Sequence, residues 1–173
     1  MSGLSRRVKI RRAANWLNLS TPLGLAVAKV GGGRLRRGPD ALYLADLYRY
    51  DFPVASAFTV GDVVISKHDL NELCARRPRL LEHEEAHSRQ WAWCGGLPFL
   101  PLYVASMGWS MARTGDRAAR SVFERRAGLA MGGYRDVPVR PVLPVIRDSV
   151  TRLRGRLLGT QAAQTGEQVG VNP

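Results

Sequence analysis

The chain has 173 residues, a net charge of +12 and only two cysteines. Its length suits one domain with a substantial hydrophobic core. Cys74 and Cys94 lack the C-x-x-C spacing, and two cysteines exclude a disulfide-rich scaffold. Nearly all of the positive charge comes from arginine, because Lys9, Lys29 and Lys67 are the only lysines.

The basic charge is compatible with two kinds of anionic partner. No recognisable nucleic-acid-binding module accompanies the arginines, and aromatic residues are not interleaved with them, so we do not expect a nucleic-acid partner. An anionic membrane surface suits a basic chain with amphipathic stretches at least as well.

Residues 1–39 are interpreted as a basic N-terminal segment. Residues 1–12 are rich in arginine and precede an uncharged stretch at 13–28 that ends in small residues, as a signal peptide does. Polar residues such as Asn15, Asn18 and Ser20 interrupt that stretch. We therefore favour a membrane-interfacial or packing segment, in a protein that is cytoplasmic or peripheral to a membrane rather than secreted.

Residues 40–158 are expected to form the domain itself. Residues 40–50 favour extended structure, and residues 52–66 are the strongest strand region, with Gly61-Asp62 as a bulge or turn. A short helix is predicted over residues 69–75, capped by Ser66 or Asp69. The fold class that follows is α+β.

The next helix contains the string His83-Glu84-Glu85-Ala86-His87, an H-E-x-x-H pattern. Pro78 suits its first turn and a glycine pair ends it. Histidines four residues apart lie on one helix face and can bind one metal ion, while Glu84 can reach a water on that ion. This is the arrangement that a zinc hydrolase needs.

Two other interpretations of this helix remain open. His83 and His87 can be core residues satisfied by hydrogen bonds, with Glu84 in solvent. Cys94 lies on the same face, but nearly two turns beyond His87, so we expect it in the core rather than as a ligand.

Residues 91–112 carry no charge, yet glycines and prolines interrupt them. We predict a helix over 100–112, in the core or at a membrane interface, rather than a transmembrane span. A helix over 120–131, an extended segment beyond Tyr134, a short basic helix over 146–158 and a disordered tail at 159–173 follow.

A catalytic zinc ion normally has three protein ligands. The candidates for the third are Glu124, Asp116, Asp136 and His68. Glu124 is preferred because it lies within an apolar helical pattern, where an unpaired buried carboxylate is costly. The alternative is a solvent-exposed glutamate that pairs with a neighbouring arginine on the same helix.

The H-E-x-x-H string followed by a helix with a glutamate resembles the gluzincin branch of the zincin metallopeptidases. The segment from Phe58 through HEEAHSRQ to FERRAG also resembles a group of small, uncharacterised bacterial zincin-like proteins. The resemblance implies a small sheet with an edge strand above the active helix. It also implies His83, His87 and Glu124 as zinc ligands and Glu84 as general base. A gluzincin adds an oxyanion-stabilising histidine or tyrosine, for which Tyr134 and His68 are the candidates.

The sequence thus predicts a Zn²⁺-dependent peptidase-like hydrolase with a peptide or protein substrate. The alternative is a non-catalytic, membrane-associated binding or scaffold protein that keeps a zincin-like fold.

Overall fold

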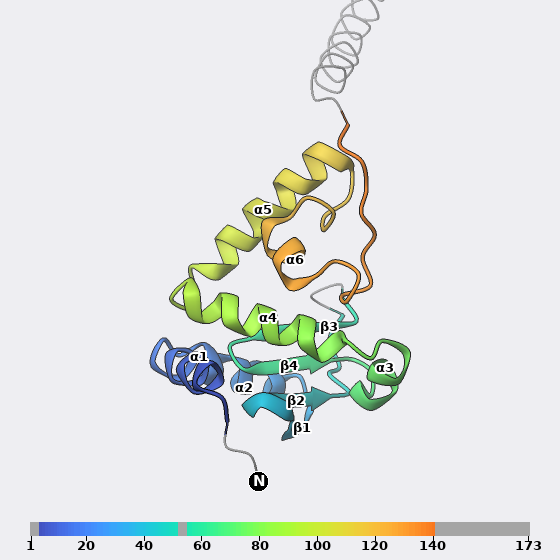
Figure 1. Cartoon of the computed structure of the whole chain (residues 1–173). Coiled ribbons are helices and arrows are strands. Elements are labelled where there is room, and N and C mark those ends of the chain that lie inside the picture. Colours follow the sequence, from blue (N-terminus) through green and yellow to red (C-terminus); the bar gives the residue numbers. More distant parts are fainter. Residues whose placement is uncertain (1–3, 52–54, 141–173) are drawn as a thin grey trace, which may run out of the picture.

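The computed structural model describes residues 4–51 and 55–140 (Figure 1). Over these ranges the fold is α+β, which confirms the predicted class, with six α-helices and a four-stranded sheet. The α-helices are α1 (Arg6–Leu17), α2 (Ser20–Val30), α3 (Leu70–Arg76), α4 (Leu80–Trp93), α5 (Phe99–Thr114) and α6 (Val122–Ala127). The strands are β1 (Arg34–Arg37), β2 (Tyr43–Asp46), β3 (Ala57–Val60) and β4 (Val63–Ser66), and a 3-10 turn, η1, covers Pro39–Ala41.

The sheet has the strand order β1-β2-β4-β3. β1 is antiparallel to β2, β2 is parallel to β4, and β3 and β4 form an antiparallel hairpin around the predicted Gly61-Asp62 turn. All four residues of β4 are buried, as expected of a strand covered on both faces. β3 is left as an edge strand, and it packs against α4.

Helices cover both faces of the sheet (Figure 1). α2 lies on one face, where Ala28 meets Ala45, Tyr48, Val63 and Ile65. The opposite face packs against α3 and α4. Its cluster consists of Leu42, Leu44, Ala57, Val64, Leu70, Leu73 and Leu80. The long H-E-x-x-H helix is therefore held by an apolar layer at its N-terminal end.

Part of the segment assigned to residues 1–39 packs with the rest of the molecule. α1 lies against α4, and β1 pairs with β2. Arg11, in the middle of the basic N-terminal run, is only 3% exposed. The predicted helix at 146–158 and the tail at 159–173 lie outside the described residues.

α5 leaves the end of α4 at an angle, and α6 lies between the two helices (Figure 1). α5 matches the helix expected at 100–112, but α6 is shorter than the one expected at 120–131, because Gly128 ends it with a φ of +92°. Only Phe99, Ser110 and Thr114 of α5 are buried.

Among residues 4–51 and 55–140, no helix combines the length and the apolar character that crossing a membrane requires.

Candidate metal centre

The inward face of α4 carries an unusual concentration of polar side chains. His83, Glu84 and His87 are each less than 10% exposed, and Gln90 is buried with them. They follow one another at helical spacing, so all of them face the space between the sheet and α6. Buried polar groups need partners, and the contacts of these residues define what the site can hold.

The two histidines are held in a defined tautomer by neighbouring carbonyl groups. Nδ1 of His83 lies 3.2 Å from the Gly128 carbonyl oxygen, and Nδ1 of His87 lies 2.8 Å from Oε1 of Gln90. Gln90 Nε2 donates to the Phe123 carbonyl at 2.9 Å, which fixes the amide with its oxygen toward His87. A carbonyl can only accept, so each Nδ1 carries a proton and the Nε2 atom of each ring is turned toward the other histidine.

The two Nε2 atoms converge. Nε2 of His83 and Nε2 of His87 are 3.1 Å apart. Burial opposes a charge on His87, but the Glu124 and Glu84 carboxylates outweigh burial and raise its pKa, so this position favours positive charge, which a proton or a metal ion can supply. Imidazoles oriented through Nδ1–H by a carbonyl are the usual form of histidine metal ligands.

Glu124 completes the group from α6. Its Oε2 is 3.4 Å from Nε2 of His83, and its Oε1 is 3.7 Å from Nε2 of His87. Ser121 caps α6 by accepting from the Glu124 backbone N–H at 3.5 Å, and the Tyr103 hydroxyl donates to Oε1. Oε2 is buried without a hydrogen-bond partner among the described residues. A buried carboxylate oxygen without a close hydrogen-bond partner is rare and leaves Oε2 available to a cation.

The charge state of Glu124 suits metal binding. Burial opposes its ionisation, but the imidazoles of His83 and His87 outweigh burial, so the pKa of Glu124 lies well below its ordinary value. Burial and then the Glu124 carboxylate raise the pKa of Tyr103, which therefore remains a hydrogen-bond donor. The carboxylate is an anion at neutral pH and can serve as a ligand.

The geometry of the three residues fits a divalent ion. One donor atom from each of His83, His87 and Glu124 lies within 4.8 Å of the others. Atoms bound at about 2.0–2.1 Å to one tetrahedral ion lie about 3.3 Å apart. The two Nε2 atoms are 3.1 Å apart, and the nearest Glu124 oxygens are Oε2 at 3.4 Å from His83 and Oε1 at 3.7 Å from His87, all close to that value. The triad can therefore bind a metal ion after only small side-chain movements.

Glu84 lies on the same helix but outside this triad. Its Oε2 accepts a hydrogen bond from the Thr59 hydroxyl of β3 at 2.6 Å. The Thr59 carbonyl in turn accepts from the Trp91 indole at 2.9 Å. These two bonds attach α4 to the edge strand at two points and fix the position of the Glu84 carboxylate.

Tyr134, the predicted oxyanion-stabilising residue, lies beside the triad. Its ring centroid is 6.1 Å from that of His83. Burial and the Glu124 carboxylate raise the pKa of Tyr134 to about 12, with a further contribution from Glu84, so its phenol is a hydrogen-bond donor at neutral pH. His68, the other candidate, lies instead in a neighbouring pocket.

The remaining ligand candidates have other places. The Asp116 side chain accepts from the backbone N–H groups of Ala118 and Ala119. Asp136 pairs with Arg120 and Arg125. Neither aspartate belongs to the metal-binding group, and Cys94 follows the last residue of α4, also outside it.

Tyr103 is a site residue that the sequence did not indicate. It lies on α5 in an uncharged stretch, where a tyrosine is more often a packing residue. The only signal was that a buried Glu124 requires hydrogen-bond donors, and the sequence does not show which helix provides them.

A buried network supports α4 from its other side. Asp62 is fully buried and accepts from Arg11 Nε at 3.1 Å, Asn15 Nδ2 at 2.9 Å and Ser88 Oγ at 2.7 Å through one oxygen. Its second oxygen accepts from the Thr21 hydroxyl at 3.1 Å. Since Ser88 follows His87 directly, this network fixes the rotation of the helix that carries the histidines.

Comparison with known proteins leaves the site to be judged on its own geometry. No protein-family model, no curated protein and no solved structure matches the chain.

Proposed function

We propose that the protein is a zinc-dependent, peptidase-like hydrolase of the zincin type. The observation that carries the proposal is the convergence of two oriented imidazoles and one carboxylate from His83, His87 and Glu124. Catalytic zinc sites use this donor set and leave a fourth position open. Mixed nitrogen and oxygen donors also suit Zn²⁺, which is intermediate between hard and soft metal ions.

A zinc ion bound there supplies Lewis-acid chemistry, acidifying a water molecule and polarising a substrate carbonyl. Glu84 accepts the proton of the attacking water and returns it to the leaving amine. The Thr59 hydroxyl holds the Glu84 carboxylate in place. Tyr134 donates a hydrogen bond to the oxygen that gains negative charge, because its raised pKa keeps the phenol protonated.

The arrangement of sheet and helix supports the zincin interpretation. β3 is the edge strand, it is antiparallel to β4, and it packs against the H-E-x-x-H helix α4. An edge strand can pair with an extended peptide and hold a peptide carbonyl near the metal. A peptide or protein is therefore the proposed substrate.

Metal analysis of the purified protein is the first test. We expect about one zinc ion per chain, lost on dialysis against a chelator and absent from His83→Ala. The control is His68→Ala, whose imidazole lies in the neighbouring pocket and should leave the zinc content unchanged. A wild-type protein that takes up no divalent metal contradicts the proposal.

Glu84→Gln tests catalysis separately from metal binding. The amide keeps the volume and the Thr59 contact but cannot accept a proton, so turnover of peptide substrates should fall by about 10² or more. Zinc content should not change, because Glu84 is not a ligand. Glu82→Gln is the matched control, since Glu82 is exposed on the same helix and pairs with Arg79. Equal turnover by wild type and Glu84→Gln refutes a catalytic role.

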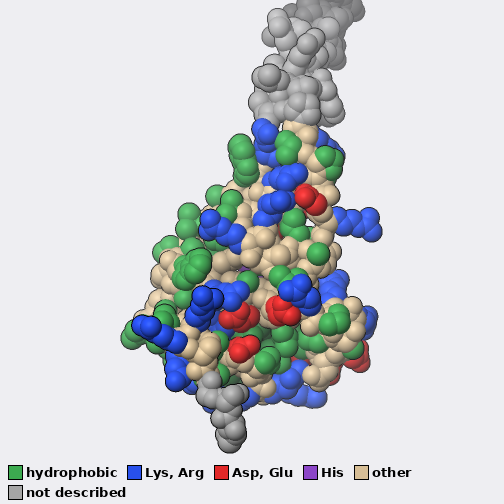
Figure 2. All heavy atoms as spheres, in the orientation of Figure 1, with side chains coloured by type: hydrophobic (Ala, Val, Ile, Leu, Met, Phe, Trp, Pro, Cys, Tyr) green, Lys and Arg blue, Asp and Glu red, His purple; other side chains and the backbone are tan. Residues whose placement is uncertain are grey.

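A second candidate function is that of a membrane-associated binding or scaffold protein. Its support is the unusual exposure of apolar side chains along α5, the turn before it and the end of α4. These residues are Trp93, Leu97, Leu100, Leu102, Val104, Trp109 and Met111. Figure 2 shows Lys and Arg side chains over much of one face, with apolar side chains along the edge formed by α5. Apolar side chains next to basic ones suit an anionic lipid surface.

A further inference from the structure

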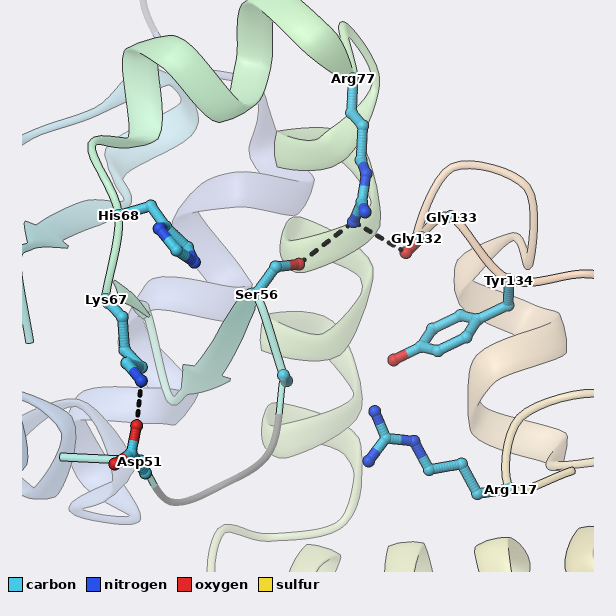
Figure 3. Close-up of a pocket in the computed structure, with 10 residues that line it drawn as sticks. Asp51, Ser56, Lys67, His68, Arg77, Arg117, Gly132, Gly133 and Tyr134 are labelled. Atoms are coloured by element: carbon cyan, nitrogen blue, oxygen red, sulfur yellow. Dashed lines mark hydrogen bonds and ion pairs between the residues drawn. The ribbon is translucent and has the colours of Figure 1, made fainter.

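A pocket of about 560 Å³ opens next to the metal centre. Gly132 and Tyr134 form a wall common to both, because they line the pocket and also lie against His83. Figure 3 shows the Tyr134 side chain extending into this space, opposite Ser56. Because the pocket and the triad share this wall, one extended peptide can occupy both.

The pocket has an excess of positive charge. Lys67, Arg77 and Arg117 line it, and Asp51, the lining carboxylate, pairs with Lys67. Within the described part of the chain, neither Arg77 nor Arg117 forms an ion pair. Two guanidinium groups are therefore left without a compensating charge at this position, on separate walls of the pocket (Figure 3).

Neutral groups hold Arg77 in position. Its Nη1 donates to Ser56 Oγ at 3.1 Å and reaches the Gly132 carbonyl at 3.5 Å. Its Cζ lies 3.0 Å from the position that a Cβ on Gly133 would take. The guanidinium is thus fixed over the loop that leads to Tyr134, while its charge remains available. A planar guanidinium that is already oriented is well suited to a carboxylate.

We infer that this pocket binds a carboxylate of the peptide substrate, through Arg77 and Arg117, beside the bond that is cleaved. The carboxylate belongs either to the C-terminus of the peptide or to an acidic side chain. The inference rests on the proposed function for its choice of a peptide, but it concerns residues outside the metal triad. It makes the protein selective for acidic peptides or for chain ends.

The test measures peptide binding to full-length Glu84→Gln protein, both metal-free and zinc-loaded. Three tetrapeptides with a neutral N-terminal fluorophore serve as probes in fluorescence anisotropy. One has a free C-terminus and no acidic side chain, one has an amidated C-terminus and one glutamate, and the third is amidated with glutamine in place of glutamate. We expect the first or the second to bind about fivefold or more tightly than the third, with the preference weakening as salt is added.

Variants assign the preference to the pocket. Arg77→Gln combined with Arg117→Gln should abolish it, and each single change should weaken it about twofold. Arg76→Gln is the matched control, since it removes the same charge from the adjacent residue, whose side chain pairs with Glu72. If the melting temperature of the double variant is much lower than that of wild type, the single variant Arg117→Gln is used as the test instead. The Arg117 side chain is exposed, so its replacement should not disturb folding.

Equal binding of the three peptides, or an unchanged preference in the folded Arg117→Gln variant, overturns the inference. The outcome is separable from the fate of the proposed function. A carboxylate preference in a protein that binds no zinc supports the carboxylate-binding pocket and contradicts the proposed hydrolase function. Zinc-dependent turnover without any carboxylate preference supports the hydrolase function and contradicts the carboxylate-binding pocket.

Discussion

Gly132 offers a direct test of how closely the metal centre is packed. A Cβ added there would lie 2.5 Å from Cε1 and 2.7 Å from Nε2 of His83. Ordinary carbon contacts are about 3.5–4.0 Å, so Gly132→Ala requires a displacement of about 1 Å. Nδ1 of His83 is bonded to Gly128 in the loop that also carries Gly132, so either the ring or this loop must move.

Metal–ligand distances tolerate only about 0.2 Å of error, and so a 1 Å displacement of the imidazole should weaken zinc binding at least tenfold. Crowding should also lower the free energy of unfolding by about 1–3 kcal/mol. Zinc affinity is measured by competition with a chromophoric chelator, and stability by urea unfolding of the metal-free protein. Gly108→Ala is the control, because its Cβ would meet nothing within 4 Å. That change in mid-helix should stabilise the protein by about 0.5–1 kcal/mol. Wild-type zinc affinity in Gly132→Ala would refute the close packing described for His83.

The other predictions concern the hydrogen bonds that support the candidate site and the binding of the exposed apolar surface to lipid. Tyr103→Phe removes the hydrogen bond to Glu124, and it should weaken zinc binding about 10–100-fold in the same competition assay. Asp62→Ala leaves the buried Arg11 with Glu85 as its remaining carboxylate and removes the acceptor of three other buried donors, so it should lower the free energy of unfolding in urea by about 3–5 kcal/mol. Binding to anionic vesicles, measured by co-sedimentation, should fall severalfold in Trp109→Ser and weaken with added salt.

The first two have a matched control, and each of the three has a contrary outcome. Tyr50→Phe, at an exposed tyrosine, should leave zinc binding unchanged, and equal affinity in Tyr103→Phe would deny the tyrosine a role in orienting Glu124. Arg79→Ala breaks an exposed ion pair and should change the free energy of unfolding by less than about 1 kcal/mol. An equally small effect of Asp62→Ala would show that the buried network around Asp62 does not stabilise the fold. A wild-type protein that ignores vesicles at low salt removes the membrane proposal.

The sequence predicted best where the chemistry is local. The four-residue spacing places His83 and His87 together on any helix. Pro78 before the helix and the glycine pair after it located α4 correctly. Glu124 could be predicted as the third residue of the site because a carboxylate in an apolar helical pattern requires a buried partner. The β3–β4 hairpin followed from β-branched residues on either side of Gly61-Asp62.

Long-range partners were beyond the sequence. The sequence of α1 is typical of a basic segment in contact with solvent. Nothing in that sequence shows that Arg11 donates a hydrogen bond to Asp62, fifty-one residues away. α2 contains Gly24, which disfavours a helix, yet Gly24 gives the close approach to Val60 and Val63 of the sheet that a larger residue would prevent. In both cases tertiary packing overrides local propensity.

The order of the ligands along the chain has a mechanical consequence. His87 and Glu124 are separated by the whole of α5, which is anchored through few buried residues. Closing a loop of roughly 40 residues costs about 3 kcal/mol in chain entropy, and an ion that joins its two ends acts as a removable staple. Without the ion, the segment from α5 to α6 should open as a unit before the sheet does, exposing it to proteases and to hydrogen exchange. An ion bound by the triad would thereby link the supply of that ion to the lifetime of the protein.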